Sequence, residues 1–123
     1  MLLVFFFSNF DIMFLVHVQV YTIDSSGQLH VRQGTQTDPG SLGSHWDLLA
    51  GPGGTLVTVS SGKDAVVVTD DLGQAWVKVT AAADWVKVGT DLRQVEVYET
   101  DETITFWAVG DDGNIYYSVN KKS

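Results

Sequence analysis

The chain has 123 residues, of which 45% are hydrophobic, which is enough for one globular domain with a modest core. Its formal net charge of -8 argues against nucleic acid as a partner, because phosphate binding rests on clustered Lys and Arg. The absence of cysteine excludes a disulfide framework, a thiolate zinc site and a cysteine nucleophile.

Residues 1–19 form a strongly apolar segment that precedes the domain expected at 20–123. A spanning helix needs about 20 largely apolar residues, whereas Asp11 and the turn-like Ser8-Asn9-Phe10-Asp11 interrupt this run, so no transmembrane span is expected. Three interpretations stay open: a buried strand segment, a signal or anchor, and the product of an imperfect gene model. The protein would be secreted if residues 1–19 act as a signal, and cytoplasmic otherwise.

Three hairpin patterns follow along the chain, each centred on a glycine. They are YTIDSSGQLHVR, VVTDDLGQAWVK and WAVGDDGNIYYS, with Gly27, Gly73 and Gly113 at intervals of 46 and 40 residues. Each pattern has an extended stretch, a polar corner and then an alternating strand. This order predicts β-hairpins in which glycine supplies the positive φ of the turn.

After each glycine, period-two alternation separates a packing face from an opposite face. The packing face is expected to hold Leu29, Val31, Ala75, Val77, Ile115 and Tyr117, and the opposite face His30, Trp76 and Tyr116. Trp46 and Trp85 each precede a glycine-containing turn and a strand, TLVTVSS or LRQVEVY. Only AAAD at 81–84 has helix-forming composition, and it is too short to stand alone. The chain is therefore predicted to be all β, with about two and a half units of roughly 40 residues.

These units resemble the tectonin repeats of β-propeller proteins, including the fish-egg-lectin-like members, over about residues 20–119. The first unit matches the pattern at Arg32, Gly34, Pro39, Gly43, Trp46, Leu56 and Val59. The later unit matches at Trp85, Gly89, Leu92, Val95, Val97, Trp107, Gly113, Ile115 and Tyr116. Lys78 and Ser118 depart from it, since both replace the arginine found at Arg32. The resemblance implies a partial β-propeller of four-stranded antiparallel blades, an incomplete ring because such propellers usually have about six blades.

A second motif lies in the middle hairpin, where TDDLGQAW fits the Asp-box of sialidase-like propellers. In that motif an aspartate satisfies backbone donors at the turn, and here this is expected of Asp71. A sialidase also needs several arginines to hold a sugar carboxylate, and this chain has only Arg32 and Arg93. An Asp-box hydrolase fragment is therefore the third hypothesis, and the chain is predicted not to be an enzyme.

The aromatic side chains beside the polar corners are the candidate ligand-binding residues. Aromatic rings cover the apolar face of a sugar while carboxylates and amides bind its hydroxyl groups. The candidates are Trp76, Tyr116, His30, Arg32, Asp71 and Asp111. No catalytic residue, metal site or cofactor is predicted, because the acidic pairs are expected to be solvated turn residues and the histidines are isolated.

Glycan recognition is the first functional hypothesis, because the resemblance implies a lectin. The second is an intracellular propeller scaffold that binds a protein or a membrane lipid, as relatives of the family do in autophagy and membrane trafficking. Self-association is expected as well, because an incomplete propeller leaves two blade faces uncovered.

Overall fold

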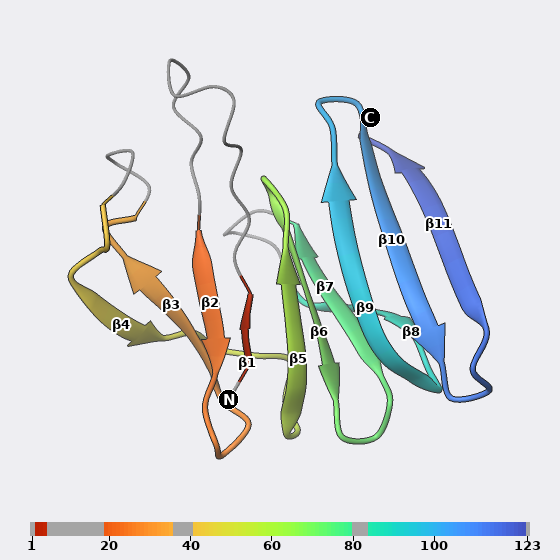
Figure 1. Cartoon of the computed structure of the whole chain (residues 1–123), viewed down its shortest axis with the longest axis horizontal. Coiled ribbons are helices and arrows are strands. Elements are labelled where there is room, and N and C mark those ends of the chain that lie inside the picture. Colours follow the sequence, from red (N-terminus) through yellow and green to blue (C-terminus); the bar gives the residue numbers. More distant parts are fainter. Residues whose placement is uncertain (1, 5–18, 36–40, 80–83, 123) are drawn as a thin grey trace.

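A computed structural model describes residues 2–4, 19–35, 41–79 and 84–122 (Figure 1). Within these ranges the chain forms eleven strands and no helix, so the all-β prediction is confirmed. It follows that no described helix is long and apolar enough to cross a membrane. Residues 5–18 of the apolar segment, Pro39 of the tectonin pattern and 81–83 of the AAAD segment lie outside the described ranges.

The strands form three antiparallel sheets that follow one another in chain order (Figure 1). The first sheet has the order β1 (Leu2–Val4), β2 (Val20–Ile23), β3 (Leu29–Gln33), β4 (His45–Leu48). The second has the order β5 (Leu56–Ser61), β6 (Ala65–Asp70), β7 (Ala75–Val79), β8 (Val86–Gly89). The third has the order β11 (Ile115–Lys121), β10 (Thr103–Gly110), β9 (Leu92–Glu99), and so has three described strands where the others have four.

All three predicted hairpins are present, as β2–β3, β6–β7 and β10–β11. Gly27, Gly73 and Gly113 have φ values of 81°, 78° and 82°, the left-handed conformation that the turn requires and that glycine adopts without steric cost. The Trp46 strand, β4, pairs with β3, and β8, which begins directly after Trp85, pairs with β7. Each of these strands therefore completes the sheet that precedes it in the chain.

Neighbouring sheets pack through one consistent pair of faces. Leu29 and Val31 of the first sheet lie in one buried cluster with Val68 of the second, and Trp76 packs against this cluster. The predicted packing-face residue Val77 of the second sheet lies in a cluster with Ile104 of the third. The packing face of one sheet thus meets the opposite face of the next.

The third sheet differs from the prediction on its own packing face. Ile115 and Tyr117 were expected to be buried, but both are exposed, and the Tyr117 ring stacks on Trp107 with centroids 5.2 Å apart. The predicted alternation is confirmed, since both side chains lie on the face equivalent to that of Leu29. This face is exposed because no described sheet follows the third one.

Main-chain hydrogen bonds connect each of the first two hairpin corners to the start of the next sheet. The amide of Leu56 donates to the Gly27 carbonyl, and the amide of Leu92 donates to the Gly73 carbonyl, each at 3.0 Å. Return bonds run from the Asp71 amide to the Thr55 carbonyl at 2.9 Å, and from the third corner back to Asp91. The corners therefore fix the spacing between successive sheets.

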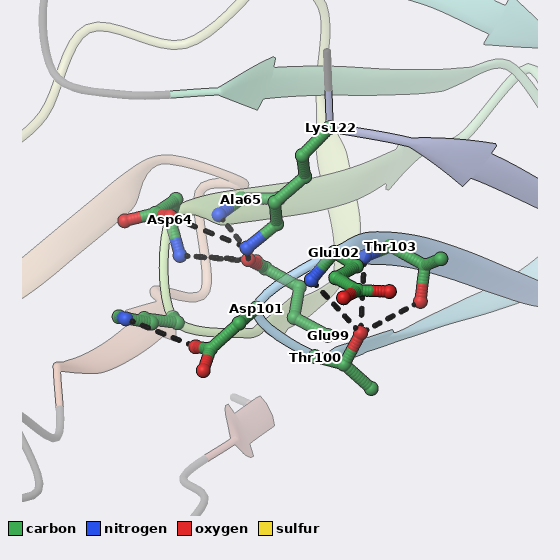
Figure 2. A network of polar contacts seen from close by, with 9 residues as sticks. Asp64, Ala65, Glu99, Thr100, Asp101, Glu102, Thr103 and Lys122 are labelled. Carbon is green, nitrogen blue, oxygen red and sulfur yellow. Dashed lines mark hydrogen bonds and ion pairs between the residues drawn. The ribbon is translucent and has the colours of Figure 1, made fainter.

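A cluster around Glu99 joins the second and third sheets (Figure 2). The Glu99 side chain is only 2% exposed, and its carboxylate accepts hydrogen bonds from the amides of Asp64 and Ala65, at 3.0 and 2.6 Å for Oε1. The Lys122 ammonium lies 2.8 Å from Glu99 Oε2 and 3.4 Å from Asp64 Oδ2. Gly62 makes room for this carboxylate, because a Cβ at that position would clash with Oε1. Nothing in the sequence pattern predicted this cluster.

Candidate binding site

A carboxylate and a ring are paired at each hairpin corner. In the first hairpin, Asp24 Oδ1 accepts hydrogen bonds from the amides of Ser26 and Gln28, at 2.8 and 3.0 Å. Its second oxygen lies 2.8 Å from His30 Nε2. One side chain therefore shapes the turn and also orients the ring six residues later.

The second hairpin repeats this arrangement. Asp70 Oδ1 accepts from the amides of Leu72 and Gln74, at 3.0 and 2.8 Å, while Oδ2 accepts from the indole nitrogen of Trp76 at 3.2 Å. The position is again three residues before the glycine, so the carboxylate bound to the ring is Asp70.

The third hairpin also pairs a carboxylate with a ring, but the carboxylate stands at a different position of the turn. Gly110 stands three residues before Gly113, where the other hairpins have aspartate, and Asp112 takes over the role. Its Oδ1 accepts from the Asn114 amide at 2.9 Å, and its Oδ2 accepts from the Tyr116 hydroxyl. A Cβ at position 110 would lie 2.6 Å from Asp112 Oδ1, so glycine there leaves room for the displaced carboxylate.

The predicted corner residues Asp71 and Asp111 have another role, so the assignment of Asp71 as the turn-capping aspartate is wrong. Both side chains are exposed, and their amides donate to main-chain carbonyls of the preceding loop, to Thr55 and Asp91, each at 2.9 Å. The sequence did contain the signal in the first two hairpins, an aspartate three residues before the glycine and a ring three residues after it.

A groove of about 970 Å³ lies between the second and third sheets. Its floor is apolar and includes Val77, Val95 and Phe106, and its polar lining includes side chains from the corner and β11. Those polar residues are Asp111, Asp112, Tyr116, Ser118 and Asn120. None of the described residues that line it is Lys, Arg or His.

Three side chains explain why the equivalent space between the first and second sheets is smaller. There Trp76 and Lys78 occupy the positions of Tyr116 and Ser118, and Trp85 packs against the shared core. The Lys78 ammonium lies 5.9 Å from the Trp85 ring centroid, and the cavity at this junction is only about 340 Å³. The large groove follows from smaller side chains and from the third sheet having no described fourth strand.

The six predicted site residues do not converge. Tyr116 and Asp111 line the groove, whereas Trp76 faces the core between the first two sheets. His30 and Arg32 lie on the outer face of the first sheet, where the Arg32 guanidinium is 5.5 Å from the Trp46 ring centroid. The groove residues that the sequence did not suggest are Asp112, Ser118 and Asn120, because only the fold brings the corner and β11 to one wall.

Hydrogen bonding sets the protonation of the groove's carboxylate and phenol. The hydrogen bond from Tyr116, followed by that from the Asn114 amide, lowers the pKa of Asp112 below its ordinary value. The same bond to Asp112 raises the pKa of Tyr116. At neutral pH the groove therefore presents an ionised acceptor beside a neutral phenol.

Comparison with known proteins adds no assignment, since no protein-family model and no curated protein matches this chain. Within the described ranges no three His, Asp or Glu side chains are placed to hold a metal ion. In the part of the chain that the structure describes, the geometry is all β, with three antiparallel sheets and a large groove between the second and the third.

Proposed function

We propose that this chain recognises a carbohydrate without catalysis, in the groove between its second and third sheets. The observation that carries the proposal is an apolar floor beside the ionised carboxylate of Asp112, the phenol of Tyr116 and the amide of Asn120. A pyranose offers an apolar face to such a floor and hydroxyl groups to such a wall. A tectonin-type partial propeller, in which each sheet is a blade, is the fold that we propose for this binding module.

The charge of the groove favours a neutral sugar. Asp111 and Asp112 line it, and no described lysine, arginine or histidine does, so a sugar carboxylate would be repelled. Arg32 lies on the first sheet and Arg93 on the third, an arrangement that gives no paired arginine site for a sialic acid. These features disfavour the Asp-box hydrolase hypothesis.

The carboxylate of Asp112 also supports binding over hydrolysis. A general acid needs a raised pKa so that it stays protonated near neutral pH. The pKa of Asp112 is lowered by its hydrogen bonds, so this carboxyl group suits an acceptor of sugar hydroxyls.

The proposal is tested by a glycan array, followed by calorimetric titration of the monovalent sugars that bind. Tyr116→Ala and Asn120→Ala should each weaken binding by about tenfold or more, since each removes a direct contact worth at least ~1.4 kcal/mol. Tyr98→Ala is the matched control, because Tyr98 is exposed on the other face of the third sheet. Absence of any bound glycan, or equal binding by all four proteins, would refute glycan recognition in this groove.

A protein-interaction module is the second candidate function, and a separate observation favours it. The third sheet exposes an aromatic face around Trp107 and Tyr117, larger than the scattered apolar side chains of an ordinary surface. This face lies on the opposite side of the sheet from the groove.

A further inference from the structure

Two sheet faces, one at each end of the stack, carry exposed large apolar side chains. The tail face, on the third sheet, holds Tyr98, Trp107, Ile115, Tyr117 and Val119, all exposed, and the exposed Glu96 opposite Trp107. The head face, on the first sheet, holds the exposed Trp46 and Leu48, the half-buried Val20, His30 and Arg32, and the buried Thr22. They are the two halves of the junction that occurs twice inside the chain.

Equivalent positions show that the tail face is a packing face without its partner. The register places Trp107 where the second sheet has Val67, and Val67 is fully buried while Trp107 is 49% exposed. Likewise Ile115 takes the position of Leu29 in the first sheet, and the two are 70% and 1% exposed. Large apolar side chains at these positions are buried wherever a following sheet is present.

Part of the head face matches the surface that such a packing face meets inside the chain. Arg32 and Trp46 are equivalent to Lys78 and Trp85, and both pairs place a cation over an indole ring. Trp85 packs against the core that the preceding sheet supplies, and its indole donates to the Ala50 carbonyl at 2.9 Å. Trp46 is exposed, because no described sheet precedes its own.

We infer that a second copy of this chain covers both faces, with the tail face of each copy packed on the head face of the other. Val31, the equivalent of Tyr117, lines the cavity between the first two sheets together with Lys78. In the assembly the Tyr117 ring therefore meets Arg32 and Trp46, an arrangement that suits aromatic and cation–π contacts.

The number of sheets determines the form of the assembly. A head-to-tail interface gives a closed ring if the rotation closes and an open filament if it does not. Two copies of this chain, with three sheets each among the described residues, bring six sheets together, within the range of about 4–8 blades in which propellers close. A closed dimer is therefore the expected product, and the groove stays open in it because the groove lies on the other side of the third sheet.

The experiment measures mass in solution by light scattering after size exclusion, at physiological salt. The unchanged chain should have twice its 13.4 kDa monomer mass. Tyr117→Lys, which blocks the tail face, and Trp46→Lys, which blocks the head face, should each be monomeric, because every junction needs one face of each kind. Leu72→Lys is the matched control, since Leu72 is exposed at the β6–β7 corner outside both faces, and it should remain dimeric.

Mixing the two monomeric variants distinguishes head-to-tail packing from a contact between two tail faces or two head faces. One intact head face and one intact tail face remain in the mixture, so a dimer with a single junction should form. Thermal unfolding of each variant alone confirms that it is folded before mixing. A monomeric unchanged chain, or two folded variants that stay monomeric when mixed, would overturn the inference, as would a Trp46→Lys variant that dimerises alone.

Discussion

The Tyr116 hydroxyl donates a hydrogen bond to Asp112 Oδ2, so the corner carboxylate and the ring of the third hairpin behave as one unit. The same pairing links Asp70 to Trp76, where the donor is an indole nitrogen. Only the tyrosine version places an ionisable ring in an open groove. The titration of the Asp112–Tyr116 pair can therefore be followed directly.

Tyr116→Phe should raise the pKa of Asp112 toward its ordinary value, because the largest cause that lowers it is removed. The folded pKa is depressed, so the bond stabilises the protein above the unfolded value of about 3.9, and this stability is lost as pH falls through the folded pKa. The difference in urea denaturation midpoint between the unchanged chain and Tyr116→Phe should therefore become smaller in acid. Carboxyl NMR titration measures the pKa, and Tyr98→Phe serves as the control that leaves it unchanged.

Glu99→Gln should lower the free energy of unfolding by roughly 1–3 kcal/mol, because a buried carboxylate loses its charge-assisted bonds to two amides and to Lys122. Glu102→Gln, at an exposed position nearby, should change it by less than about 0.5 kcal/mol. Urea denaturation checks both.

Alkaline pH gives the Glu99 cluster a second, independent test. The hydrogen bond to Glu99 raises the pKa of Lys122. The stability that this hydrogen bond contributes is fully present below the pKa of an unfolded lysine, about 10.4. It is lost as pH rises through the raised pKa of Lys122 in the folded protein. The difference in free energy of unfolding between the unchanged chain and Glu99→Gln should therefore become smaller in strong base. A difference that stays constant would mean that Lys122 does not contribute to it.

Gly27→Ala should destabilise the fold more than Gly113→Ala, although both glycines have nearly the same φ. Each substitution places a side chain in the left-handed region, at a cost of about 1–2 kcal/mol. A Cβ at Gly27 would also clash with Thr55 Cγ2, whereas nothing lies within 4 Å of one at Gly113. The difference between their unfolding free energies isolates the clash, and equal losses would show that the loop moves freely.

The hairpins could be predicted from the sequence because their signals are local. A glycine that must adopt positive φ stands between an extended stretch and an alternating strand, and Gly27 and Gly73 needed no distant contact to be recognised. Alternation also assigned Ile115 to the correct face of its strand. It could not predict the exposure of Ile115, because exposure depends on whether another sheet follows.

The groove could be predicted only in part. Tyr116 was found from its ring beside a polar corner, but Asp112 was missed because the third hairpin moves the carboxylate two positions from where Asp24 and Asp70 stand. Asn120 comes to the groove only through the pairing of β11 with β10. The contact between Glu99 and Asp64 joins residues 35 positions apart, and no repeated pattern in the sequence indicates it.

The close approach of Gly62 to Glu99 also constrains how this sequence can vary. A relative with alanine at position 62 has no room for the long carboxylate, and a relative with a shorter residue at position 99 is free to lose the glycine. The two positions should therefore change together among related chains, although 36 residues separate them. Such paired substitution would identify other chains in which the second and third sheets are joined in this way.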